Sequence, residues 1–404
     1  MLNVFNTATC MIALLNNFFL LYRREYCAVG SSLLIVVEAF PEWLLARRKR
    51  PAGSGGAAAV CVKYPRRALM SEVAVAGRPA VWRGRLGVES QTAAVKPDVR
   101  RALQLGLAAI WLLDGVLQYQ SFMYSTGFGK MLAGTASGNP SVIARPINWD
   151  ATLVNHHLVL IDTIFATIQI LLGLGIAFRP TVRLGLAASI PWAIGVWWFG
   201  EGLGGILNGV ASPLNGAPGA VIIYALLAVL LWPADRDVSA PFAAARAVGA
   251  HVARALWLVL WLSLAYFALT PANRAPQALN GMIAGMESGE PGWLSAIDRG
   301  AASLVAHQGL AASIALSVAL VVIAIGVYLP RPAAKATLVL AIVVAIVIWV
   351  VGEGFGMILA GGATDPNSGL LLVLLTLTYW PAGTVSASTG AAPVLSADAA
   401  GELV

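Results

Sequence analysis

Charged residues are scarce in this chain of 404 residues: they make up 11% of it, whereas hydrophobic residues make up 58%. A soluble globular domain carries roughly 25% charged residues. Because a soluble globule needs a polar surface, so low a charge content excludes a large soluble protein. Several apolar runs reach the roughly 20 residues that a helix needs to cross a bilayer. They are continuously apolar and do not alternate, which favours membrane helices over a β-barrel.

Cysteine is also scarce. The three cysteines, Cys10, Cys27 and Cys61, all precede residue 100, and none forms a CxxC pair. The sequence therefore predicts neither a dithiol redox pair nor a cysteine zinc site. Stretches that interleave aromatic and basic residues are absent, so no nucleic-acid partner is expected. The net charge of +7 instead indicates topology signals and contact with the anionic headgroups of the lipid bilayer.

A glycine-rich motif with a single carboxylate occurs twice, each time at the end of a long apolar run. The copies are GEGLGGILNG at 200–209 and GEGFGMILAG at 352–361. Their glutamates are 152 residues apart, and His156 and His307 are 151 residues apart. Motif, order and spacing agree, which predicts one structural unit used twice.

Four apolar runs are expected as spans in each copy; in the first they are 103–120, 153–178, 184–200 and 217–232. The predicted fold is therefore an all-α membrane protein of two tandem four-helix transmembrane units, with about eight spans. Because four is an even number, both units enter from the same side and the repeats are parallel. Basic residues cluster at one set of helix ends, which predicts that these ends, the N-terminus and the inter-unit linker are cytoplasmic, in a bacterial plasma membrane.

Composition shifts place the domain boundaries. We expect an N-terminal basic segment at 1–100, a first membrane unit at 101–235, a cytoplasmic linker at 236–250, a second membrane unit at 251–383 and a disordered tail at 384–404.

The N-terminal segment has two interpretations. It contains a short or interrupted apolar stretch, which is consistent with one membrane-associated helix. Alternatively Met70 is the first residue of the protein and the preceding 69 residues are a misassigned start.

Histidine and glutamate are predicted to meet near the outer membrane surface. His156 is expected to open the second span and Glu201 to end the third, at the same depth; His307 and Glu353 are expected to pair in the same way. His157 adjoins the first pair. Such groups bind protons, cations or ligands, and carboxylates at membrane depth face a cavity or a partner. The alternative is structural: solvated or hydrogen-bonded glutamates and capping histidines. Two ligands are too few to define a metal site.

Three further acids are candidates of lesser weight. Asp114 lies within the first apolar run, and Asp162 lies within the second; a buried acid in a span is a functional candidate. Asp365 belongs to the sequence DPNSG, which is typical of a turn.

The chain resembles the DoxX-like membrane proteins. The residues that carry the resemblance are LGLAAIW at 105–111 and LLGLGIAFRP at 171–180, and it covers 101–233 better than 254–381. The resemblance implies four-helix units and small membrane subunits linked to quinone or thiol redox chemistry. The tandem arrangement and the absence of cysteine from the units depart from that pattern.

Three functional hypotheses stay open. The first is a redox-linked accessory subunit whose outer cluster binds a quinone, a metal or a membrane redox partner. The second is a transporter of small solutes or ions that uses the cleft between the units. The third is a structural scaffold, in which the chain forms a homo-oligomer or supports others without chemistry. The sequence defines no reaction and no substrate.

Overall fold

The structure, a computed structural model, describes residues 98–234 and 240–381, which contain helices and turns but no β-strand. Five of the described helices are long and apolar enough to cross a membrane: Leu158–Ala177, Arg179–Phe199, Ala250–Ala268, Gly309–Gly326 and Arg331–Gly352. Large aliphatic side chains on them face outward; Val259, for example, is 67% exposed. Lipid would cover such side chains at no cost. These helices indicate an integral membrane protein, as predicted. The cysteines, the segment before residue 98 and the tail after residue 381 lie outside the described residues.

The first half of the described chain has a long helix, a short helical hairpin, two long helices and a short last helix. These are α3 (Val99–Leu117), α4 (Thr126–Thr135), α5 (Ser141–His156), α6 (Leu158–Ala177), α7 (Val182–Phe199) and α8 (Ala220–Leu230), with the 3-10 turns η1 (Arg179–Thr181), η2 (Gly202–Gly205) and η3 (Pro213–Asn215).

The second half follows a similar order after a short connecting helix. Its elements are α9 (Ala243–Val248), α10 (Ala250–Ala268), α11 (Pro271–Arg274), α12 (Ala278–Met286), α13 (Gly292–Val305), α14 (Gly309–Gly326), α15 (Arg331–Val347), the π-helical turn η4 (Ile348–Gly352), the 3-10 turn η5 (Gly354–Met357) and α16 (Asn367–Thr378).

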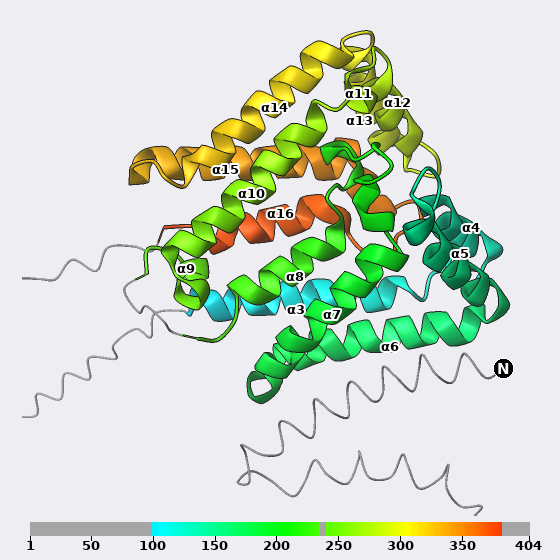
Figure 1. Ribbon diagram of the computed structural model, residues 1–404, viewed down its shortest axis with the longest axis horizontal. Coiled ribbons are helices and arrows are strands. Elements are labelled where there is room, and N and C mark those ends of the chain that lie inside the picture. The colour runs from blue at the N-terminus through cyan, green and yellow to red at the C-terminus, as the bar shows by residue number, and fades with distance from the viewer. Residues whose placement is uncertain (1–97, 235–239, 382–404) are drawn as a thin grey trace, which may run out of the picture. The chain divides into compact units, whose positions relative to one another are not determined.

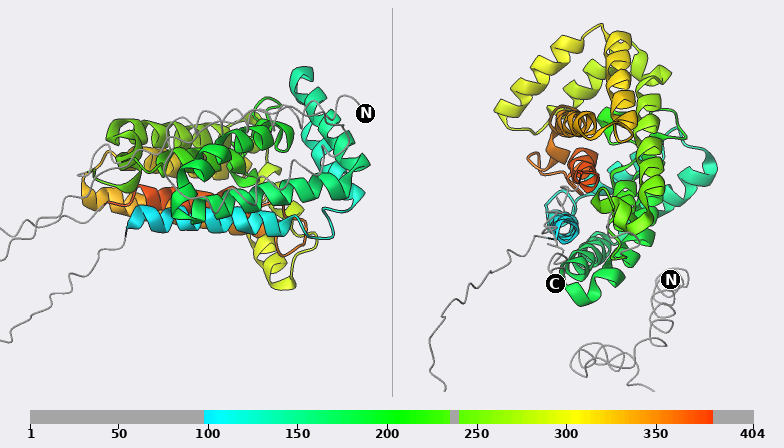
Figure 2. Two further views of the ribbon diagram at one scale, coloured as in Figure 1. Left: turned by 90° about the horizontal axis from the view of Figure 1, so that it is seen from below. Right: turned by 90° about the vertical axis from the view of Figure 1, so that its left-hand side faces the viewer.

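Contacts between helices also follow one scheme in the two halves. In the first, α3 packs on α6, α6 on α7 and α7 on α8; in the second, α10 packs on α14, α14 on α15 and α15 on α16. The halves meet where α16 packs against α8 and α3. The end-on view in Figure 2 shows α15, α16 and α3 in a row. The helix α9, which falls within the expected linker, packs on α8 and α10.

The short last helices differ from the expected spans. α8 has 11 residues and α16 has 12, which at 1.5 Å per residue is roughly 17–18 Å, well short of a bilayer core. Each follows an irregular segment, 200–219 and 353–366, that turns before the helix begins. The glycines of these segments favour turns over helix. α3 is long enough to span but carries Arg100, Arg101 and Asp114 in its 19 residues.

The connection at 122–150, between the first two predicted spans, is largely helical. α4 and α5 pack on each other, and α12 and α13 form the same kind of hairpin in the second half. Ser125 starts α4 by accepting a hydrogen bond from the Gly127 N–H (3.2 Å), as an N-cap does. The second span therefore begins at Leu158 and not near residue 153.

Basic residues hold together the end of the helices where α9 lies. Arg101 donates to the carbonyl of Ile176 (3.0 Å), and Arg183 donates to the carbonyl of Pro233 (3.3 Å). Figure 1 shows the start of α3, the start of α7 and the turn between α14 and α15 at this end. The helical hairpins lie at the opposite end.

Close packing of α3 on α6 depends on Gly173. A Cβ atom there would lie 2.7 Å from Leu112 Cγ and 2.9 Å from the carbonyl oxygen of Ala108. Small residues let membrane helices approach in this way. We expect Gly173→Val to lower the free energy of unfolding in detergent by about 1–3 kcal/mol, as overpacking does. Gly195→Val on α7 is the matched control, because nothing lies within 4 Å of a Cβ at Gly195; equal losses in both variants would contradict the close-packing argument.

Candidate functional site

The two glycine-rich motifs share an unusual backbone. Leu203 and Gly204 have φ of 58° and 63°, and Phe355 and Gly356 have φ of 54° and 67°. This left-handed region favours glycine. Glycine is also required sterically at Gly356, because a Cβ atom would lie 2.6 Å from the Pro366 carbonyl carbon. The turn redirects the chain after the long helix and leaves the preceding glutamate at its start.

A tryptophan fastens each motif to the segment before the short helix. Trp197 Nε1 donates to the carbonyl oxygen of Pro218 (2.6 Å), and Trp349 Nε1 donates to that of Pro366 (2.7 Å). These hydrogen bonds give both tryptophans a structural role within the protein.

Glu353 binds the start of α16. One carboxylate oxygen accepts from the Ser368 hydroxyl, and the other accepts from the Gly369 N–H (2.9 Å). The side chain is only 2% exposed, and burial raises its pKa to about 7. A carboxylate at a helix N-terminus satisfies N–H groups that have no partner in the helix. Glu353 is therefore a helix cap, which agrees with the structural interpretation of this residue.

Glu201 occupies the same place before α8, but it is only half satisfied. Its Oε1 accepts from the Val221 N–H (3.2 Å), whereas its Oε2 is buried and has no hydrogen-bond partner. Burial, followed by repulsion from Asp365, raises the pKa of Glu201 to about 8. A carboxyl group with such a pKa holds its proton at neutral pH. Glu201 differs from Glu353 in that one of its carboxylate oxygens has no hydrogen-bond partner.

Asp114 lies in the interior against α8. The Tyr224 hydroxyl donates to its Oδ2 (2.6 Å), while its Oδ1 is buried without a partner. Tyr224 is itself fully buried, and its ring lies 4.3 Å from that of Trp111. The sequence singled out Asp114 but not Tyr224, although this is the one polar side chain in the apolar helix α8.

Asp365 repels three other acids and is half-buried, and the sequence assigned it to a turn. Its carboxylate accepts from the Thr364 hydroxyl (2.9 Å) and from the Asn367 N–H (2.7 Å), which is indeed turn chemistry. The loop that carries it is tied to the end of α3 by Gln118 and Gln120, which donate to the carbonyls of Thr364 and Ala363. Burial raises the pKa of Asp365.

Electrostatic repulsion links Asp365 to Asp114, Glu201 and Glu353. We call these four residues the acidic cluster. The groups that act on them are other carboxyl groups, the hydroxyls of Tyr224, Ser368 and Thr364, and backbone N–H groups; no basic side chain is among them. The cluster joins both motifs, α3 and α8 at the place where the two halves meet.

The predicted pairing of histidine with glutamate is wrong. His156 is the last residue of α5 and bonds through Nδ1 to the Thr152 carbonyl (2.7 Å), and His157 lies exposed at the break before α6. His307, at the break between α13 and α14, contacts Gln277 (2.8 Å). The glutamate carboxylates accept hydrogen bonds from the start of the helix that follows each of them, and not from the histidines.

Metal ligands are not assembled in the described part of the chain: no group of three or more His, Cys, Asp or Glu side chains there is placed to hold a metal ion. Asp162 is fully buried at the start of α6, where it interacts with Tyr124. It lies outside the acidic cluster.

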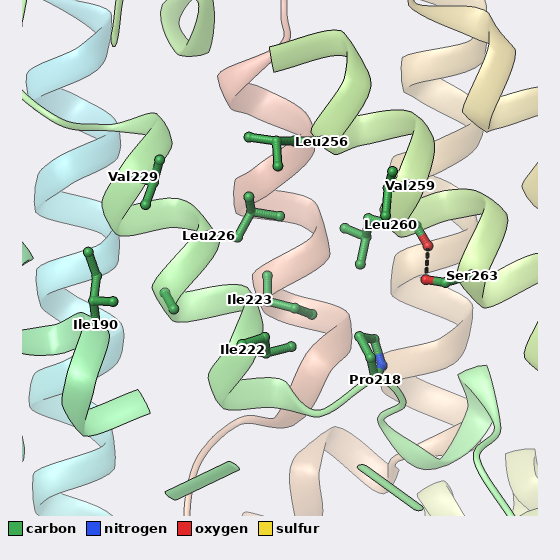
Figure 3. A pocket seen from close by; sticks show the side chains of 11 residues that line it. Ile190, Pro218, Ile222, Ile223, Leu226, Val229, Leu256, Val259, Leu260 and Ser263 are labelled. Carbon is green, nitrogen blue, oxygen red and sulfur yellow. Dashed lines mark hydrogen bonds between the residues drawn. The ribbon is translucent and has the colours of Figure 1, made fainter. Parts of the chain in front are cut away.

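An apolar groove of about 360 Å³ lies between α7, α8 and α10. Figure 3 shows Ile222, Leu226 and Val229 on one side of it and Leu256 and Val259 on the other. Pro218 lies at one end, and the following residue, Gly219, contacts the Glu201 carboxylate. The groove thus runs along α8 toward the acidic cluster.

Comparison with known proteins adds no family to this geometry: no family model, no curated protein and no solved structure matches the chain.

Proposed function

We propose that this protein moves protons or small cations across a membrane, with the acidic cluster as the site that binds them. The observation that carries the proposal is the electrostatic interaction of four acidic side chains, of which Asp114 and Glu353 are buried and Glu201 and Asp365 are half-buried, with two unpartnered oxygens, Asp114 Oδ1 and Glu201 Oε2. Acids within membrane proteins are typical of proton relays and ion pathways.

The sign of the charge selects the ligand. An unpaired carboxylate taken out of water costs several kcal/mol, and repulsion among neighbouring carboxylates adds to that cost. A proton or a cation at the cluster would lower both the cost of burying the charge and the repulsion among the carboxylates, whereas an anion would raise both. The proposed cargo is therefore positive and small.

The proposed framework consists of two tandem parallel four-helix units, in which α3, α6, α7 and α8 correspond to α10, α14, α15 and α16. The matching order of elements and the matching backbone of the two motifs support it. The basic end near α9 supports a cytoplasmic location for that end, in the plasma membrane of a bacterium. Between the halves, the irregular segments 200–219 and 353–366 are partly buried in protein, where membrane proteins tolerate non-helical backbone.

A second candidate is a redox-linked subunit of the DoxX-like kind. The apolar groove beside α8 favours it, because an isoprenoid tail of a quinone needs such a surface and its head would approach Glu201. A quinone in a solvent extract of the purified protein would support this candidate over transport alone.

Flux measurement in proteoliposomes tests the proposal. An imposed membrane potential should drive proton, Na⁺ or K⁺ uptake by the wild type, and Asp114→Asn or Glu201→Gln should lower the rate roughly ten-fold or more. Asp150→Asn, on α5 outside the cluster, is the matched control and should leave the rate unchanged. Wild-type vesicles that take up none of these cations, or cluster variants with full flux, would refute the proposal and favour a structural scaffold.

A further inference from the structure

A second pair of acids lies on the helical hairpin of the second half, outside the five apolar helices. Glu290 precedes α13 and Asp298 lies within it. Asp298 is fully buried, and all four carboxylate oxygens of the pair are buried without a hydrogen bond from any other described group. The two carboxyl groups hydrogen-bond to each other. This pair does not belong to the acidic cluster.

The pair contacts the second glycine-rich motif. A Cβ atom at Gly354 would collide with Glu290 Oε1, so that the carboxylate lies directly against the backbone of this residue. Gly354 begins η5, whose Phe355 packs against Trp293 of α13 with ring centroids 6.1 Å apart. A ligand between the two carboxylates would therefore fasten α13 to the motif.

Charge does not balance at the pair. Glu287 repels both members, and its own carboxylate is engaged by Arg299 (3.3 Å). One cation beside three carboxylates leaves the buried pair uncompensated. Buried charges in proteins are paired or coordinate a metal.

The negative charge of the pair can be compensated by a shared proton or by a divalent cation, and the two differ in how many carboxylate oxygens they contact. A single shared proton forms one O–H···O bond, which satisfies two of the four oxygens. A divalent cation held by two carboxylates can contact all four. The cation therefore accounts for the arrangement more completely than the proton does.

The position of Asp298 is not one that packing alone requires to be acidic. The residue 151 positions earlier, Ile147, is also fully buried, and there the site is filled by an apolar side chain. Likewise, Asn139, 151 positions before Glu290, is uncharged and donates to the Thr135 carbonyl (2.8 Å). The second half has carboxylates at both places.

We propose that Glu290 and Asp298 bind a divalent cation of the Ca²⁺ type, which fastens the hairpin of α12 and α13 to the motif at Gly354. Carboxylates that bind through both oxygens suit Ca²⁺ better than Mg²⁺, which demands a near-ideal octahedron and keeps several of its waters. Sites with few carboxylates have dissociation constants on the order of 10⁻⁴–10⁻³ M in proteins outside the cell.

Equilibrium dialysis with Ca²⁺ and thermal unfolding of the purified full-length protein in detergent test the site. The wild type should bind Ca²⁺ and unfold at a higher temperature in Ca²⁺ than in Na⁺ of equal ionic strength. The variant Glu290→Gln with Asp298→Asn should lose both responses, and Asp298→Ile, which introduces the residue found at Ile147, should lose them in a folded protein.

Two control variants distinguish Ca²⁺ binding at this pair from cation binding at the acidic cluster. Asp150→Asn should retain the Ca²⁺ response, and so should Glu201→Gln, because the acidic cluster is a different site. No Ca²⁺ response in the wild type would overturn the proposal. So would stabilisation by acid without stabilisation by Ca²⁺, because a shared proton would then compensate the pair.

Discussion

Glu353→Ala is expected to lower the free energy of unfolding by about 3–5 kcal/mol at pH 6. The substitution leaves the fully buried Ser368 hydroxyl and the Gly369 N–H without an acceptor, and each unsatisfied buried group costs about 1–3 kcal/mol. Loss of the side chain also leaves a cavity. At pH 6, below its pKa of about 7, Glu353 is largely protonated, so relief of a buried negative charge offsets little of the loss.

Chemical denaturation of the purified protein in mixed micelles measures this effect. Glu353→Gln is the informative partner variant, because its amide oxygen still accepts one hydrogen bond, and it should recover roughly half of the loss. Ser368→Ala combined with Glu353→Ala should be less than additive, since the two residues share one bond. If Glu353→Ala is as stable as the wild type, Glu353 does not cap α16.

Hydropathy and charge were sufficient to predict a helical membrane protein. The runs that become α6, α7, α10, α14 and α15 are apolar over the full thickness of a bilayer, and no soluble fold could bury so many such helices. Pro180 marks the turn between α6 and α7, since proline favours the start of a helix. Hydropathy and charge indicate how long each helix is and which of its ends lies on which side of the membrane.

Hydropathy and charge could not predict which side chains of neighbouring helices contact each other. His156 and Glu201 were predicted to meet, but His156 ends α5 and bonds within that helix, whereas Glu201 accepts a hydrogen bond from the start of α8. Asp365 was hidden for another reason: a turn sequence is the same whether the turn is in water or buried between helices. The short helices α8 and α16 were overestimated because their apolar composition continues into the flanking segments.

The stability of the protein should also depend on pH through Glu201. Its pKa lies at about 8 in the folded protein against an ordinary value of 4.5, so the folded state binds this proton more tightly than the unfolded chain. Stability that derives from Glu201 is therefore greatest below pH 4.5, falls as pH rises from there to about 8, and stays low above it. At about 1.4 kcal/mol per pKa unit the full difference is about 5 kcal/mol.

Glu201→Gln isolates this effect from other titrating groups, because only the difference between variant and wild type is compared. The stability of the variant relative to the wild type should increase by about 3–5 kcal/mol between pH 4.5 and pH 8.5. Glutamine still accepts from the Val221 N–H through its amide oxygen, so the cap on α8 survives. A relative stability that is constant across this range would mean that Glu201 ionises as an ordinary solvated carboxyl group. The same titration would then remove the main reason to regard this motif, and not that of Glu353, as the one that binds the transported cation.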